Sequence, residues 1–179
     1  TSKQLKLGIN LAENIPIRVM VDDHRVKQVV TNLVSNAVKF TESGHVCVDV
    51  SYEELLEKER GVLTFKVEDT GIGIDQDKLT TIFEPFTQED EGVSRQFGGT
   101  GLGLAICCQL VSMMGGKLVA TSTKGVGTCF EFSIEVEAIP VFGWRSEVIN
   151  KGLLICSNYD YADQVLKECR LAKINLFGV

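Results

Sequence analysis

The sequence is poor in the residues that mark nucleic-acid-binding proteins and histidine-rich metal proteins. Its 18 lysines and arginines are outnumbered by 24 acidic residues, so the net charge is -6 and the isoelectric point is near 5.0. This balance argues against a nucleic-acid partner. Only two histidines are present, which leaves little for a metal site built from histidine.

Paired cysteines, long apolar runs and export signals are also missing. The six cysteines form no CxxC pair, and each lies in an apolar segment, so we expect reduced thiols in a cytoplasmic compartment. No run reaches about 18 apolar residues, and no basic-then-apolar signal opens the chain. The sequence starts without methionine and stops in "NLFGV", so we expect a piece of a longer protein. Whether that parent is anchored in a membrane stays open.

The composition that remains is that of a globular chain. With 44% hydrophobic and 23% charged residues, 179 residues can bury a core and form one domain plus a short addition. Apolar periodicity and breaker residues predict the elements in chain order. These are an extended segment at 5–11, a helix capped by Asp22 or Asp23 and ending near Gly44, strands at 46–52 and 63–67, a lid-like segment at 71–103 with a short helical piece at 78–83, a buried helix at 102–114, and strands at 117–122 and 128–136.

This order predicts an α+β fold, a two-layer α/β sandwich. Its helices are expected on one face of a mixed, mainly antiparallel sheet.

A polar stripe interrupts the apolar helix predicted after Asp22. Asn32, Asn36 and Lys39 follow one another at i, i+4 and i+7, so they share one side of the helix. Amide oxygens suit a hard cation such as Mg²⁺, and lysine suits phosphate, so the stripe would fit a metal-bound polyphosphate. On this segment alone, an ordinary polar helix face is the simpler interpretation of the same three residues.

Three glycine-rich stretches follow. "EDTGIGI" places Asp69 at the end of a strand, where a carboxylate can accept the amine of adenine, although a tight turn is the plainer interpretation. "GGTGLGL" places glycines before a helix, where free N–H groups form an anion site. Its spacing is not that of a dinucleotide fold, because no βαβ unit surrounds it. "GVGT" is also compatible with a simple hairpin turn.

The four motifs together, in this order, resemble the ATP-binding catalytic domain of a sensor histidine kinase. The resemblance covers about Leu5 to Val136 and rests on "DDHRVKQVVTNLVSNAVKFT", "VEDTGIGI", "IFEPFTQ", "GGTGLGLAICCQLVSMMGG" and "GVGTCFEF". It implies the Bergerat-type fold of the superfamily that histidine kinases share with DNA gyrase, heat-shock chaperone ATPases and mismatch-repair ATPases.

The resemblance also implies ligands and roles. Asn36 would hold Mg²⁺ on ATP, while Asn32 and Lys39 would contact the phosphates as the catalytic positions. Phe83 and Phe86 would anchor the lid, and Arg95 would reach the γ-phosphate or stay solvated. The other implied nucleotide contacts are Phe40, Asp69, Gly71, Gly73, Ile74, Gly99, Thr100, Gly101, Leu102, Gly103 and Thr128.

The identity of residue 32 helps to distinguish phosphoryl transfer from ATP hydrolysis. Hydrolases of the superfamily place a glutamate general base at this position, and an amide cannot take a proton, so phosphoryl donation is favoured over ATP hydrolysis. Neither His24 nor His45 resembles the acceptor, so the acceptor is expected upstream, on a dimerisation domain of the same homodimeric protein. A pseudo-kinase that binds nucleotide and regulates a partner without transfer is the alternative.

The last residues form a separate prediction. We expect the catalytic domain at 1–138, a linker at 139–151 and the truncated start of a receiver-like domain at 152–179, as in a hybrid kinase. Cys156 and Ser157 stand where a receiver has its acidic pair, so the receiver-like domain either cannot be phosphorylated or serves as a spacer before a genuine receiver. A plain C-terminal extension is the alternative. We expect it to pack on the catalytic domain or on a neighbouring copy, and a response regulator or receiver domain to act downstream.

Overall fold

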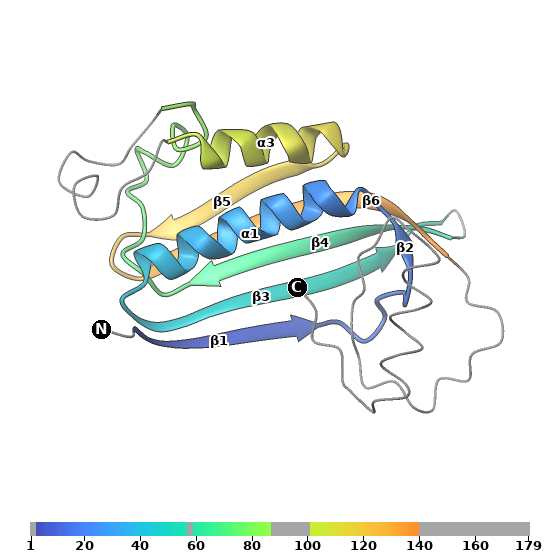
Figure 1. Ribbon diagram of the computed structural model, residues 1–179, viewed down its shortest axis with the longest axis horizontal. Coiled ribbons are helices and arrows are strands. Elements are labelled where there is room, and N and C mark those ends of the chain that lie inside the picture. Colours follow the sequence, from blue (N-terminus) through green and yellow to red (C-terminus); the bar gives the residue numbers. More distant parts are fainter. Residues whose placement is uncertain (1–2, 57–58, 87–100, 140–179) are drawn as a thin grey trace.

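The protein is built around one six-stranded sheet. The computed structural model describes residues 3–56, 59–86 and 101–139. Figure 1 shows the chain order of the elements. They are β1 (Gln4–Leu11), β2 (Val19–Met20), α1 (Asp23–Phe40), β3 (Ser43–Glu54), β4 (Arg60–Asp69), α3 (Gly103–Met113), β5 (Lys117–Thr123) and β6 (Gly127–Ala138).

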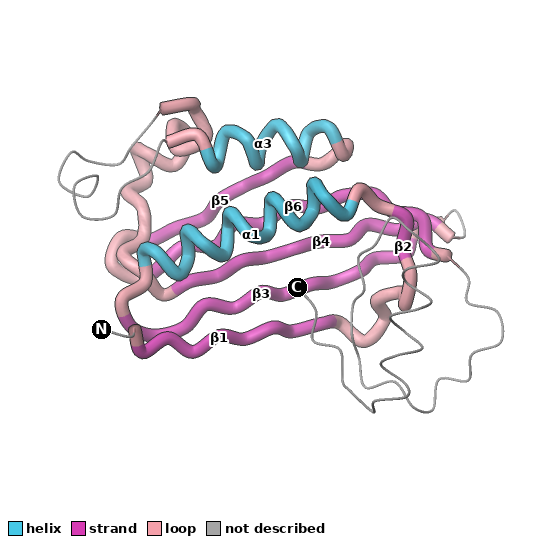
Figure 2. The backbone as a smooth tube through the Cα atoms, in the orientation of Figure 1, coloured by secondary structure: helices cyan, strands magenta, loops and turns pink. Residues whose placement is uncertain are grey.

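The sheet is mixed and mainly antiparallel, as predicted. Its strands follow the order β1-β3-β4-β6-β2, and β5 also pairs with β6. Only β1 and β3 run parallel among the described pairs. Both α1 and α3 cover the same face of the sheet (Figure 2), so the predicted two-layer sandwich is confirmed.

The core lies between this face and the helices. Alternate residues of β3, β4 and β6 point inward, and α1 adds an apolar stripe. The rings of Phe65 and Phe132 stack with centroids 4.8 Å apart at the centre of the sheet. The opposite face carries ion pairs such as Lys66 with Glu131, at 2.9 Å. The alternation in the sequence therefore identified the buried face correctly.

Helix α1 begins where the sequence predicts and ends earlier. The Asp22 side chain accepts a hydrogen bond from the Arg25 backbone at 3.1 Å, so Asp22 is the N-cap. The helix ends at Phe40 rather than near Gly44, because Thr41 is extended and both its backbone N–H and its hydroxyl bond the Ala37 carbonyl. Residues from Ser43 onward already belong to β3.

Two further expectations were wrong. Residues 78–83 form hydrogen-bonded turns rather than a regular helix, although the bond from the Ile82 N–H to the Lys78 carbonyl, at 3.1 Å, has the spacing of a single helical turn. Helix α3 is not buried all round, since Met113 is 64% exposed and Ile106 is 38% exposed. The contacts of α3 with other elements are mainly with α1 and β5.

Candidate functional site

The polar stripe of α1 forms one side of the site. Asn32, Asn36, Lys39 and Phe40 are all half-buried. The Asn36 amide nitrogen donates to Asn32 Oδ1 at 3.1 Å, and the ammonium of Lys39 lies 4.7 Å from the centre of the Phe40 ring. Because Asn36 bonds Asn32 through nitrogen, its own oxygen is the atom suited to a cation.

Helix α3 meets this stripe at its N-terminus. A Cβ added to Gly103, the first residue of α3, would lie 2.8 Å from Asn32 Nδ2, so the absence of a side chain lets the two helices approach here. The first N–H groups of a helix have no acceptor within the helix and attract anions. Asn32 and the start of α3 therefore lie close together, and both offer hydrogen-bond donors of the kind that bind phosphate.

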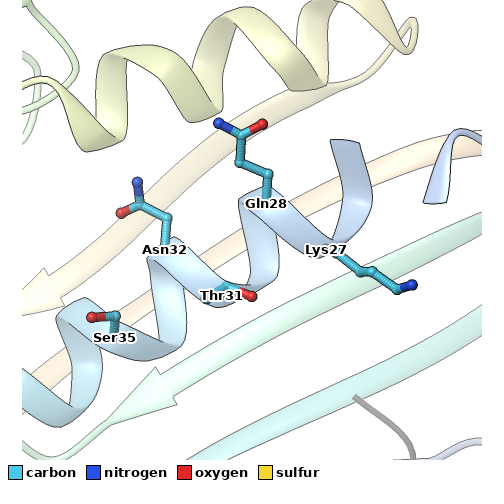
Figure 3. A pocket seen from close by; sticks show the side chains of 5 residues that line it. All are labelled: Lys27, Gln28, Thr31, Asn32 and Ser35. Atoms are coloured by element: carbon cyan, nitrogen blue, oxygen red, sulfur yellow. The ribbon is translucent and has the colours of Figure 1, made fainter. Parts of the chain in front are cut away.

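A groove continues from Asn32 along α1 toward the N-terminus of the helix. Its volume is about 570 Å³, and Figure 3 shows Gln28 and Asn32 projecting on the side of α1 that faces α3. The lining side chains are Lys27, Gln28, Thr31, Asn32 and Ser35. None of these five is a carboxylate. Among the described residues that line this groove beside Asn32, none is a general base of the carboxylate type.

Asp69 forms the other end of the site. It is the last residue of β4 and only 7% exposed. The Gly71 N–H donates to Asp69 Oδ1 at 2.8 Å, and the Thr128 N–H also bonds the carboxylate. Burial raises the pKa of Asp69 above its ordinary value, and these two hydrogen bonds oppose that rise. The result is a sheltered acceptor that stays available to a ligand amine.

The turn after Asp69 joins the two ends. The Ile72 N–H bonds the Phe40 carbonyl at 3.3 Å, which holds this turn against the C-terminus of α1. A Cβ on Gly71 would lie 2.4 Å from the same carbonyl and 2.9 Å from Asp69 Oδ1. Glycine therefore allows the close approach of this turn to Phe40 and Asp69. The amide oxygens of α1 are of the type that suits Mg²⁺ bound to phosphates.

The hairpin between β5 and β6 approaches the same turn. Gly127 has φ +145°, and a Cβ there would lie 2.0 Å from the Asp69 carbonyl oxygen. Gly125, two residues earlier, has φ +77° with nothing within 4 Å of an added Cβ. Substitutions at these two glycines therefore distinguish the cost of a steric clash from the cost of an unfavourable backbone conformation.

Replacing Gly127 with alanine should destabilise the fold by about 3 kcal/mol, because the new methyl group forces β6 away from Asp69. The Gly125→Ala control changes only the backbone preference and should cost about 1 kcal/mol. Urea unfolding followed by circular dichroism measures both. Equal losses for the two variants would contradict the close approach at Gly127.

Several predicted site residues are placed by the structure and others are not. Ile74 and Thr128 flank the Asp69 end, and Gly101 and Leu102 lead into α3. Arg95, Gly99 and Thr100 lie outside the described residues, as do residues 152–179.

The two predicted lid anchors, Phe83 and Phe86, differ in their surroundings, and residues 87–100 of the lid itself lie outside the described residues. The ring of Phe83 packs edge-on against Phe130 at 6.5 Å, whereas the side chain of Phe86 is 76% exposed. Phe86 adopts φ 66° and is held through its backbone N–H, which bonds the Gly101 carbonyl at 3.1 Å. This conformation turns its ring away from the core.

The histidines and the described cysteines lie outside the candidate site. His24 and His45 are exposed, and the four described cysteines are free thiols. Burial raises the pKa of Cys107 to about 12. Within the described ranges, no cluster of three histidine, cysteine or acidic side chains could hold a metal ion, so a cation would depend on amide oxygens and phosphates. No described helix has the length and apolar character needed to cross a membrane.

Sequence reasoning missed Ser122. This residue is 8% exposed in β5, and its hydroxyl bonds both the turn after Asp69 and strand β6. The available signal was its position, because Leu118, Ala120 and Ser122 alternate and the last is polar where the others are apolar.

Comparison with known proteins places the chain in a class. Residues 21–138 match the family described as histidine kinase-, DNA gyrase B- and HSP90-like ATPase, and the chain belongs to this family.

Within that class the similar proteins are histidine kinases. The chain is 41% identical over 137 residues to the autoinducer 2 sensor kinase/phosphatase LuxQ of Vibrio harveyi, covering 76% of this chain and 16% of that protein. It is 33% identical over 175 residues to hybrid signal transduction histidine kinase F of Dictyostelium discoideum, covering 94% of this chain and 16% of that protein. The curated relatives are much longer, and the matched regions span 6% to 19% of their lengths.

A solved structure shows the same fold. Full-length ShkA in complex with AMPPNP superposes with a TM-score of 0.65 at 30% identity, covering 83% of this chain and 29% of that one. The family and fold predicted from the motifs are thereby confirmed.

Proposed function

We propose that this domain binds Mg-ATP and donates the γ-phosphate to a histidine on a separate dimerisation domain. The observation that carries the proposal is the meeting of three polar elements. The amide stripe of α1, the open N-terminus of α3 and the buried carboxylate of Asp69 surround one site whose turn is held to the end of α1.

Each end of the site has its own task. Asn36 presents an oxygen to Mg²⁺, which when bound neutralises phosphate charge. Asn32 and Lys39 hold the phosphates together with the backbone around Gly101, Leu102 and Gly103. In the same proposal Arg95, Gly99 and Thr100 add phosphate contacts. At the base end, Asp69 accepts the adenine amine, and the flanking contacts come from Phe40, Gly71, Gly73, Ile74 and Thr128.

Asn32 and the side chains that line the groove beside it favour phosphotransfer over ATP hydrolysis. An amide cannot remove a proton from water, and the groove side chains include no carboxylate. A histidine nitrogen needs no such base, because it attacks as a neutral nucleophile. The domain then contributes positioning and charge neutralisation.

The proposal extends to the parent protein. The similarity to a hybrid histidine kinase over 94% of this chain supports a receiver-like segment at 152–179, beyond a linker at 139–151. The dimerisation domain of the same homodimeric protein would supply the acceptor, and a receiver domain or response regulator would take the phosphate onward. In the same proposal this segment lies in the cytoplasm, whether or not the parent protein is anchored in a membrane.

Isothermal titration tests the nucleotide half of the proposal. Mg-ATP is expected to bind at roughly micromolar affinity or weaker, and chelation of Mg²⁺ should weaken binding. Mg-GTP should bind about ten- to hundredfold less tightly, because the guanine carbonyl meets the Asp69 carboxylate lone pair to lone pair. Equal affinities for the two nucleotides would contradict the adenine assignment. Transfer to a supplied dimerisation domain separates the kinase from a pseudo-kinase.

A further inference from the structure

Ser122 connects the two walls of the base end of the site. It lies on β5 with its side chain directed inward, and only 8% of it is exposed. On one side of it is the turn that follows Asp69. On the other is Thr128, which stands directly opposite Asp69 in the pairing of β4 with β6. Side chains of directly opposed residues emerge on the same face of a sheet.

The Ser122 hydroxyl makes three hydrogen bonds. It accepts from the Ile74 N–H at 2.8 Å and donates to the Gly127 carbonyl at 2.7 Å. Its third partner is the Thr128 hydroxyl, at 2.9 Å. A hydroxyl has one proton and two acceptor lone pairs, so these bonds use its full capacity.

The direction of the third bond follows from the other two. A carbonyl can only accept, so the Ser122 proton is committed to Gly127, and the Ile74 N–H can only donate. The Thr128 hydroxyl must therefore be the donor in its hydrogen bond with Ser122. Thr128 Oγ1 then has only lone pairs to offer any further partner.

The backbone of Ser122 and the hairpin that follows it also hold the turn after Asp69 in place. The Gln76 side chain donates to the Ser122 carbonyl at 2.5 Å, and the Gly125 N–H donates to the Ile72 carbonyl at 2.7 Å. Together with the bond from Ile74, these contacts clamp the turn after Asp69 to the β5–β6 hairpin. Loss of the Ser122 hydroxyl would remove the hydrogen bond from the Ile74 N–H to this clamp.

We propose that Ser122 is a positioning residue that sets the preference for adenine. By accepting a hydrogen bond from the Thr128 hydroxyl, it leaves Thr128 Oγ1 as an acceptor beside the Asp69 carboxylate. Two neighbouring acceptors match the two N–H groups of an adenine amine and repel the carbonyl oxygen of guanine. This inference rests on the proposed function and names the residue that tunes its base specificity.

The test measures the ratio of ATP to GTP affinity by titration of the whole chain. Ser122→Ala frees the Thr128 proton to turn toward the base and should lower the ratio about three- to tenfold. Ser122→Cys keeps nearly the same volume but bonds weakly through sulfur, so it should act in the same direction and serves if the alanine variant does not fold. Ser133→Ala is the matched control, because it removes another hydroxyl pair of the sheet, that of Thr64 and Ser133 at 2.8 Å.

A second comparison tests whether Ser122 acts through Thr128. Thr128→Val should lower the ratio by itself, and adding Ser122→Ala to it should change the ratio no further. An unchanged ratio in a folded Ser122 variant, or an equal fall in the Ser133→Ala control, would overturn the inference while leaving ATP binding in place. Absence of ATP binding to the unaltered chain would instead overturn the proposed function.

Discussion

Replacing Asn36 with alanine is expected to abolish phosphotransfer, with a loss of at least about a hundredfold. The substitution removes the amide oxygen that we propose as the Mg²⁺ ligand, and it also removes the donor that bonds Asn32 at 3.1 Å. Asn36→Asp should fail too, because it sets an anion beside the phosphates. Metal-free nucleotide binding should survive in the alanine variant, since the base end of the site is unchanged.

Asn10→Ala provides the matched control for Asn36. The Asn10 side chain also makes an amide hydrogen bond, to Asp49 at 2.6 Å, but on the sheet face opposite the helices. Transfer of labelled phosphate from ATP, followed over time, should be normal in this control. Normal transfer by Asn36→Ala would show that the metal is held elsewhere.

Replacing Asp69 with asparagine should lower ATP affinity about ten- to hundredfold and remove the discrimination against GTP. Asparagine keeps the size and can still accept from Gly71, but its amide nitrogen can face the guanine carbonyl. Asp49→Asn, on the sheet face opposite the helices, is the control and should leave both affinities unchanged. Calorimetric titrations with both nucleotides measure the effect, and an unaltered ATP affinity in Asp69→Asn would contradict the assignment.

The same substitution should stabilise the protein at neutral pH. Burial raises the pKa of Asp69 above the ordinary 3.8, so the folded protein holds this proton more tightly than the unfolded chain does. Stability therefore falls as pH rises from 3.8 through the raised pKa, and the neutral asparagine avoids this loss. Thermal unfolding should show Asp69→Asn more stable than the unaltered protein at pH 7, with no such advantage below pH 3.8. A lower melting temperature at pH 7 would show that the charge is well solvated.

Periodic features of the sequence predicted much of the fold. The helix start at Asp22 depends on a local cap, and the inward faces of β3, β4 and β6 depend on alternation, so both could be predicted from neighbouring residues. The end of α1 could not, because Thr41 turns away to begin a strand whose partners are distant in sequence. The exposed side of α3 was missed for a related reason: an apolar helix does not reveal which of its sides a neighbour covers.

The candidate site, too, could be predicted where a local motif marks it and was missed where contacts distant in sequence define it. The motif order brought Asn32, Asn36 and Asp69 into one hypothesis, and the fold places their segments around one site. Ser122 escaped because a single serine in a strand carries no motif. Its significance comes from bonds to Ile74 and to Thr128, which lie 48 and 6 residues away. Only the pairing of β5 with β6 makes those bonds visible.

The most direct measurement is transfer of the γ-phosphate from labelled ATP to a separately supplied dimerisation domain from the parent protein. The account predicts Mg²⁺-dependent, acid-labile label on a histidine of that domain, with little inorganic phosphate released when the acceptor is omitted. Bound nucleotide without label on the acceptor would contradict it and favour a regulatory pseudo-kinase. Steady release of inorganic phosphate without the acceptor would also contradict it, because a site with Asn32 in place of a general base should not hydrolyse ATP efficiently.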